Sequence, residues 1–160
     1  MADSQYTTDV YNKQGGRELV VKSTGMIRNQ GYDIKKQSAP TAKTTAVTLT
    51  IAELLTTIIT GTHAAGATQA YTLPDGSLID AAFLAAGLSL EADDSFDWSL
   101  INLSAAALDT ITVTAGTGHT IVGNPIVQSA HSSTGGVYGN SSRWRTRKTA
   151  ADTYVSYRIA

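Results

Sequence analysis

SFDWSLINL, residues 95–103, decides the fold class together with the run TITVTA at residues 110–115. In the first run Phe96, Trp98 and Leu100 fall on one face of an extended chain, and the other face carries an aspartate, a serine and an isoleucine. The second run alternates threonine with isoleucine and valine in the same way. A period of two predicts strands that bury one face and expose the other.

Shorter runs of the same kind lie on both sides of this stretch. Residues 142–148 and 153–159 are separated by the turn Thr149–Asp152 and predict a hairpin. Short strands separated by turns are typical of sandwiches and barrels. We therefore expect a mainly β fold, an antiparallel β-sandwich or jelly-roll-like barrel with two short helices. The other predicted strands are residues 44–50, 70–73, 120–122 and 125–130.

The first predicted helix follows the strand at residues 44–50. Thr50 and Glu53 match the Thr-x-x-Glu capping box, which marks a helix N-terminus. We predict a helix over residues 51–59, with Gly61 as its C-cap.

The second predicted helix spans residues 78–86, where apolar residues recur at helical spacing. Gly87 is expected to end it. The preceding Pro74-Asp75-Gly76 predicts a turn, because proline presets φ and glycine tolerates positive φ. We expect both helices to be crossovers or lids.

The chain changes character near Ala42. Residues 1–42 hold few apolar residues, show no sustained period and are interrupted by glycines and Pro40. Such a segment cannot offset the entropy of ordering, so we expect an extended arm before a folded domain at residues 43–160. Aromatic anchors on a polar segment are typical of an arm that lies across a partner surface; a leader without a role is the alternative. The predicted contact residues are Tyr6, Tyr11, Arg17, Leu19, Val20, Arg28 and Tyr32.

Charge is unevenly distributed although the net charge is only −1. Residues 1–43 carry seven basic and four acidic residues, whereas residues 44–110 carry eight acidic residues and no lysine or arginine. Residues 111–160 carry five basic residues and one acidic residue. A polarised chain can dock face to face with copies of itself or with a partner. Solvated acidic loops are the alternative interpretation.

The run RWRTR places Arg143, Arg145 and Arg147 on one face of a strand and Trp144 on the other. Arginines interleaved with an aromatic ring can bind nucleic acid. The chain is not net basic and shows no RNA-binding signature, so we expect no nucleic-acid partner. Arginine suits bidentate pairing with carboxylates. We expect this row to pair with acids of residues 44–110, within the chain or across a contact between subunits.

GTGHTIVGN, residues 116–124, raises the question of a phosphate-binding loop. A phosphate loop needs a lysine and a following helix, and a dinucleotide fingerprint needs a βαβ unit; neither pattern is present. We interpret Gly116 and Gly118 as a tight corner between two strands. His119 is then a corner side chain.

No constellation in the sequence indicates catalysis or a cofactor. His63, His119 and His131 lie far apart, and the chain has no cysteine. Asp93, Asp94 and Asp97 lack calcium-loop spacing and fit a solvated turn better. The sequence also lacks the Gly-x-Ser-x-Gly elbow that would support a Ser-His-Asp triad. We expect no enzyme, metal or cofactor, and also no secretory signal and no membrane span.

Three runs carry a resemblance that extends from Val47 to Ala160. They are LTIAELLTTIITGTHAAGATQAYTLPDGSLIDAA, DSFDWSLINLSAAALDTITVTAGTGHTIVGN and SSRWRTRKTAADTYVSYRIA. In overall pattern they resemble small virion proteins of tailed phages, in particular head decoration (cement) proteins. That resemblance implies a β-sandwich or jelly-roll body.

The resemblance also implies a function. Proteins of this kind form trimers on the outer capsid surface and lock the expanded shell, often through an N-terminal arm. We therefore expect a non-enzymatic decoration protein, made in the host cytoplasm and located on the virion, with the major capsid protein as its partner. The arm would be the capsid-binding or inter-subunit element. The alternative is another virion part, such as a head-fibre base or a tail-fibre domain that recognises a host glycan.

Overall fold

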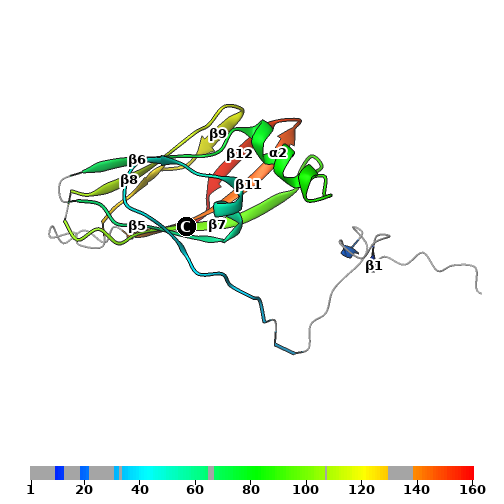
Figure 1. Ribbon diagram of the computed structural model, residues 1–160, viewed down its shortest axis with the longest axis horizontal. Helices are drawn as coiled ribbons and strands as arrows, with labels where there is room; N and C mark the ends of the chain where they lie inside the picture. Colours follow the sequence, from blue (N-terminus) through cyan, green and yellow to red (C-terminus); the bar gives the residue numbers. More distant parts are fainter. Residues whose placement is uncertain are drawn as a thin grey trace, which may run out of the picture. The chain divides into compact units, whose positions relative to one another are not determined.

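The computed structural model describes residues 10–12, 19–21, 31–32, 34–64, 67–106, 108–129 and 139–160 (Figure 1). By its internal contacts the chain divides into residues 1–36, here the N-terminal unit, and residues 37–160, here the body. Residues 37–42, which we assigned to the arm, fall within the body by these contacts.

The N-terminal unit contains a small sheet. Strands β1 (Val10–Asn12) and β2 (Leu19–Val21) pair antiparallel, with Tyr11 opposite Val20. The aromatic and β-branched residues at these positions suit strands. An isolated pair of strands is only marginally stable in water.

The body contains two sheets that form two layers (Figure 1). The six-stranded sheet has the order β3-β5-β7-β11-β12-β9, and the four-stranded sheet has the order β10-β8-β6-β4. The strands of the first are β3 (Thr41–Lys43), β5 (Ile58–Gly61), β7 (Ser95–Asn102), β9 (His119–Val122), β11 (Ser141–Ala150) and β12 (Thr153–Arg158). Those of the second are β4 (Val47–Thr48), β6 (Thr68–Thr72), β8 (Thr110–Thr114) and β10 (Ile126–Val127).

The prediction of an antiparallel β-sandwich or jelly-roll-like barrel is wrong. Of the eight strand pairings described in the body, five are parallel. The fold is mixed α/β, with two sheets of largely parallel strands and two short helices. From β3 to β10 the chain changes sheet at every connection, so β5 and β7, or β6 and β8, become parallel neighbours. Parallel neighbours need a crossover, and here each crossover includes a strand of the opposite sheet.

The two sheets share one core. Trp98 of β7 lies opposite Trp144 of β11, and their rings stack with centroids 5.5 Å apart and planes 10° apart. Trp98 Nε1 donates to Thr146 Oγ1 at 3.0 Å, and Trp144 Nε1 donates to Ser142 Oγ at 2.7 Å. The predicted inward faces of these strands are therefore confirmed. The four-stranded sheet contributes Tyr71, Ile111, Val113 and Val127 to this core.

Helix α1 (Ile51–Leu55) begins at the predicted capping box of Thr50 and Glu53, which is confirmed. The helix ends before residue 59, where we predicted its end. Thr57 has a φ of 70°, which breaks the helical path, and the chain continues as β5 between β3 and β7. β-branched residues pack well in such a central strand. Gly61 is consequently the last residue of β5 and not a helix cap.

Helix α2 (Gly76–Ala85) corresponds to the second predicted helix, and Gly87 follows it with a φ of 74°. Pro74-Asp75-Gly76 does not form a separate turn, because Asp75 is already the N-cap position. The Asp75 carboxylate makes no capping bond and accepts the Thr117 N–H at 2.7 Å.

The first glycines of residues 116–124 lie in the corner between β8 and β9, residues 115–118, as the hinge interpretation predicts, and residues 119–122 form β9 itself. Gly118 has a φ of 75°. The corner packs against the start of α2, where the Gly76 N–H donates to the Thr117 carbonyl oxygen at 2.9 Å. A Cβ atom on Gly76 or on Gly118 would overlap the carbonyl oxygen of Asp152 in the β11–β12 turn. Three chain segments therefore meet here without room for a side chain.

We expect Gly76→Ala to lower the free energy of unfolding by about 1–3 kcal/mol, because the new methyl group meets backbone that cannot swing away. Helix propensity alone predicts that alanine would raise the free energy of unfolding, because alanine is the better helix former. Gly139→Ala is the control, since the nearest atom to its Cβ would be 3.6 Å away. Urea unfolding of both variants measures the effect. A Gly76→Ala protein as stable as the unmodified chain would contradict this close packing.

Candidate interaction surface

Helix α2 has an unusual composition for a helix at the surface of a protein. Its sequence GSLIDAAFLA contains a single charged residue, Asp80. The other side chains that reach solvent include Leu78 and Leu84, which are 58% and 72% exposed. A surface helix ordinarily presents charged and polar residues to solvent. The exposed side of α2 instead carries leucine, alanine and the single serine Ser77, and we call the surface of Leu78 and Leu84 the apolar face of α2.

Asp80 points toward the β11–β12 hairpin and fixes α2 there. Its carboxylate accepts hydrogen bonds from Lys148 Nζ at 2.7 Å, from the Asp152 N–H at 2.9 Å and from the Tyr154 hydroxyl. Burial alone would raise the pKa of Asp80, but these hydrogen bonds and the charge of Lys148 lower it to about 2. Burial and the Asp80 carboxylate raise the pKa of Tyr154, so its hydroxyl stays a donor.

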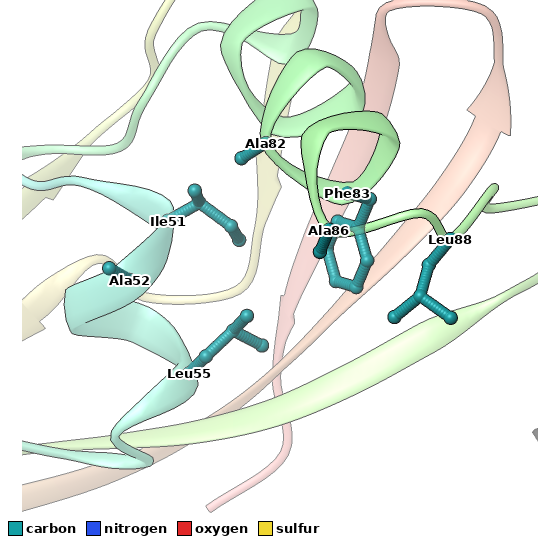
Figure 2. A pocket seen from close by; sticks show the side chains of 7 residues that line it. All are labelled: Ile51, Ala52, Leu55, Ala82, Phe83, Ala86 and Leu88. Atoms are coloured by element: carbon teal, nitrogen blue, oxygen red, sulfur yellow. The ribbon is translucent and has the colours of Figure 1, made fainter. Parts of the chain in front are cut away.

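An open groove of about 230 Å³ lies between α1 and α2. Side chains from both helices, and Leu88 from the loop after α2, point toward one another across it (Figure 2). None of the lining residues is charged, and Leu55 is 45% exposed. A cavity of ~150 Å³ with similar lining holds benzene, so this groove can hold an aliphatic side chain. The lining residues are Ile51, Ala52, Leu55, Ala82, Phe83, Ala86 and Leu88.

A second hollow of about 150 Å³ adjoins the groove through Leu88, which lines both. Leu84 and Leu90 also line it, and Asp80 and Lys148 form its polar floor. Leu84 belongs both to this hollow and to the apolar face of α2, so the groove, the hollow and this face adjoin; we call them together the apolar surface, which includes the Asp80–Lys148 pair in the hollow. Exposed apolar surfaces mark docking sites for proteins or other ligands.

The predicted arginine row is paired within the chain. Asp97 accepts from Arg143 at 2.7 Å and from Arg145 at 2.7 and 3.0 Å, and Asp93 accepts from Arg147. The Arg145 guanidinium is the main cause of the lowered pKa of Asp97; partial burial opposes it and Arg143 adds to it. Exposed ion pairs contribute little to stability. An additional role of the row between subunits stays a prediction.

Only some of the predicted arm residues can be placed. Tyr6, Arg17 and Arg28 lie outside the described residues. The backbone of Tyr11 pairs with that of Val20 in the register of β1 and β2, and Leu19 is exposed in β2. Tyr32 is 97% exposed. Among the members of this set that the structure describes, Tyr11 and Val20 are paired through their backbones.

The histidines lie in separate places, and His131 is outside the described residues. His63 is buried; its backbone N–H donates to Ser104 Oγ at 2.9 Å, and a 3.2 Å hydrogen bond joins its ring Nε2 to the Tyr71 hydroxyl. Burial raises the pKa of Tyr71 to about 12. These bonds hold the end of β5 against β6, which is a structural role.

His119 begins β9, and neither of its ring nitrogens has a hydrogen-bond partner. Its ring meets the Tyr154 ring edge to face, with centroids 5.5 Å apart. Burial lowers the pKa of His119 to about 4, against an opposing effect of Asp75. The ring therefore behaves as a neutral packing residue at the corner.

Within the described part of the chain, no three His, Asp or Glu side chains gather as ligands for a metal ion. Asp93 and Asp97 instead bind arginines, and Asp94 Oδ2 accepts the Glu91 N–H at 2.8 Å. No helix among the residues described is long and apolar enough to cross a membrane.

Comparisons with protein-family models, with curated proteins and with solved structures gave no match to this chain. The apolar surface is therefore the feature on which an interpretation of function can rest. None of the predicted site residues appears among the described residues that line its groove and hollow. The signal was present in residues 76–85, where a predicted helix contains a single charged residue and therefore has no charged face.

We expect Asp80→Asn to lower the free energy of unfolding by on the order of 2–4 kcal/mol, because Lys148 would keep its charge without a carboxylate partner. The contribution of the ionised Asp80 carboxylate to the free energy of unfolding is present above its ordinary pKa of 3.8 and is lost as the pH falls toward 2. Asp152→Asn is the control, since asparagine also adopts the left-handed backbone seen there at a φ of 55°. Equal unfolding midpoints for both variants at pH 7 would contradict the anchoring role.

We expect the free energy of unfolding to decrease as the pH is lowered from 6.5 to about 4, because of His119. The unfolded chain takes up a proton near the ordinary pKa of 6.5, and the folded chain only near 4. His119→Phe should retain the edge-to-face contact and remove this dependence. Thermal unfolding temperatures at half-unit pH steps compare the two proteins. Parallel curves over this window would show that His119 does not titrate as described.

Proposed function

We propose that this protein is a non-enzymatic virion structural protein, a decoration protein that binds the outer surface of an expanded phage head as a trimer and stabilises it. Its partner is the major capsid protein. The observation that carries the proposal is the apolar face of α2, which presents Leu78 and Leu84 to solvent beside an open groove.

The composition of this surface supports a binding role. The cores of protein interfaces are apolar and depleted of charged residues, and the groove and the apolar face of α2 share that composition. The Asp80 network and the capped start of α1 hold the two helices in place before any partner arrives. A preorganised surface loses less entropy on docking than a mobile one.

The charge pattern supports assembly from many copies. The body segment at residues 44–110 is purely acidic in its charged residues, and the chain before it is net basic. Complementary charges guide docking and suppress wrong orientations. On a lattice of identical sites, several modest contacts per trimer add up to firm attachment.

Co-sedimentation with expanded, undecorated phage heads tests the proposal. We expect saturation at many copies per head, in a multiple of three. Leu84→Lys should weaken this binding by about tenfold or more, because a charge would enter the core of the contact.

Leu108→Lys is the matched control, since Leu108 is 78% exposed in the loop between β7 and β8, away from α2. Saturation at only a few copies, or no binding, would contradict the decoration role. A few copies would favour a head-fibre base or a tail-fibre domain, and glycan screening would then follow.

A further inference from the structure

We propose that a hollow on the outer face of the six-stranded sheet binds Glu91 of a second copy of the chain, with Arg143 as the partner of its carboxylate. We call this hollow the Arg143 hollow. The inference deepens the proposed function and rests on the trimer in it, because it names a contact that joins one subunit to the next.

The Arg143 hollow has a volume of about 290 Å³ and lies over β5, β7 and β11. Its shape follows from the strand register. Ser99 lies opposite Ile58 on one side and opposite Arg143 on the other, and two positions along β7 Ile101 lies opposite Ser141. Alternate residues of β7 point into the core, so these side chains point outward. Small serines beside larger side chains leave the space open. The lining residues are Ile58, Ser99, Ile101, Ser141, Ser142, Arg143 and Ala160.

Arg143 brings a positive charge to this hollow. Its side chain is 58% exposed, and its Nη2 donates to Asp97 Oδ2 at 2.7 Å. Arg145 donates to the same carboxylate at 2.7 and 3.0 Å, so one carboxylate serves two guanidinium groups. Nε and Nη1 of Arg143 make no hydrogen bond with the described residues, among which Asp97 is its one ion-pair partner. A guanidinium with unpaired donors suits a further carboxylate.

The rest of the lining suits a carboxylate that is carried on an alkyl chain. Ile58 and Ile101 offer apolar contact to the methylene groups of a glutamate side chain. The hydroxyl groups of Ser99 and Ser141 can donate to its carboxylate. An inorganic anion would use the guanidinium and the hydroxyl groups but leave the isoleucines uncovered.

The pairing of the acidic residues singles out Glu91 as the occupant. In the described part of the body, the carboxylates of Glu91 and Asp152 make no hydrogen bond and no ion pair. Asp152 has the shorter side chain, and its residue lies in the packed corner against Gly76 and Gly118. Every other carboxylate of the described body already accepts a hydrogen bond; these belong to Glu53, Asp75, Asp80, Asp93, Asp94, Asp97 and Asp109.

The loop that carries Glu91 is held in a fixed turn. The Glu91 N–H donates to Asp94 Oδ2 at 2.8 Å, and the Asp94 N–H donates to the Glu91 carbonyl oxygen at 3.2 Å. Lys148 of β11 exchanges backbone hydrogen bonds with Asp93 and Asp94. Glu91 is therefore exposed on a preorganised turn, and a preorganised group loses less entropy on docking.

The basic residues beside this turn are already paired. Arg147 donates to Asp93 at 2.9 Å, and Lys148 Nζ donates to Asp80 at 2.7 Å. The turn thus carries an acidic side chain without a cation, whereas the Arg143 hollow carries a cation that shares its acid. Complementary charges of this kind guide docking between copies.

Glu91 lies too far from the Arg143 hollow of its own chain. The turn is fixed to Arg147 and Lys148, at the other end of β11 from Arg143. Strands rise about 3.3 Å per residue, so Arg147 and Arg143 are about 13 Å apart along β11. A second copy must supply the glutamate. A head-to-tail contact of this kind closes into a ring if the rotation between copies closes.

Molecular mass from light scattering, over a dilution series of the full-length chain, tests the contact. We expect Glu91→Arg and Arg143→Glu each to weaken self-association by about tenfold or more, because each places like charges together. The double variant Glu91→Arg/Arg143→Glu restores opposite charges and has the net charge of the unmodified chain. It should associate again. A double variant that associates as weakly as the single variants would overturn the pairing of these two residues.

Ser99→Leu tests the hollow without a change of charge, because the larger side chain fills the space in which Glu91 would lie. We expect it to weaken self-association by about tenfold as well. Ser95→Leu is the matched control, since Ser95 lies on the same strand and face but opposite Arg147, outside the hollow. Equal effects of the two leucine variants would overturn the role of the hollow. Unfolding midpoints show that each variant is folded.

The outcomes separate this inference from the proposed function. Trimers that persist unchanged in Glu91→Arg and Ser99→Leu overturn the inference and leave the proposed function standing. An unmodified chain that is monomeric at all concentrations overturns both the inference and the proposed trimer. Trimers that respond to the variants as expected but do not bind phage heads overturn the decoration role alone.

Discussion

The stack of Trp98 on Trp144 is the interaction on which the body depends. The two indoles lie directly opposite each other on β7 and β11 and are fully enclosed. Enclosing an indole is favourable only if its N–H finds an acceptor, and Thr146 and Ser142 supply one each. The Thr146 hydroxyl is also hydrogen-bonded to Ser156 on β12. These hydrogen bonds inside an apolar core fix the register of β7, β11 and β12. The four-stranded sheet packs on the surface that these strands form.

The alternation between sheets explains why the apolar surface lies where it does. Most connections in the body are short, but the connection from β6 to β7 includes α2. The helix must cross from one sheet to the other, and Asp80 holds it against the β11–β12 hairpin. With its one charged side chain used on the inner side, α2 presents mainly apolar side chains on the outer side, where Ser77 is the one polar residue. The position of the candidate surface thus follows from how the helix is anchored.

Local patterns in the sequence predicted local structure well. The capping box at Thr50, the C-terminal hairpin and the buried face of β7 each depend on residues close together in the chain, and all three are confirmed. Strand direction depends on which strands become neighbours, and a period of two is the same for parallel and antiparallel strands. The end of α1 was missed because pairing of β5 between two other strands outweighs helix propensity. The groove was missed because it forms only where the fold places α1 beside α2, and no local pattern in the sequence shows that the two helices are neighbours.

The place of β11 in its sheet has a consequence for how the protein is made. This strand follows nearly all others in the chain, yet it sits between β7 and β12 and supplies half of the indole stack. Until residues 141–158 leave the ribosome, one side of β7 has no partner and Trp98 has no ring to cover it. A nascent chain of this design exposes an unpaired strand with an apolar face, which is the kind of edge that pairs with other chains. Completion of the fold is therefore a late event, and the yield of native protein should depend on chaperones and on the rate of synthesis.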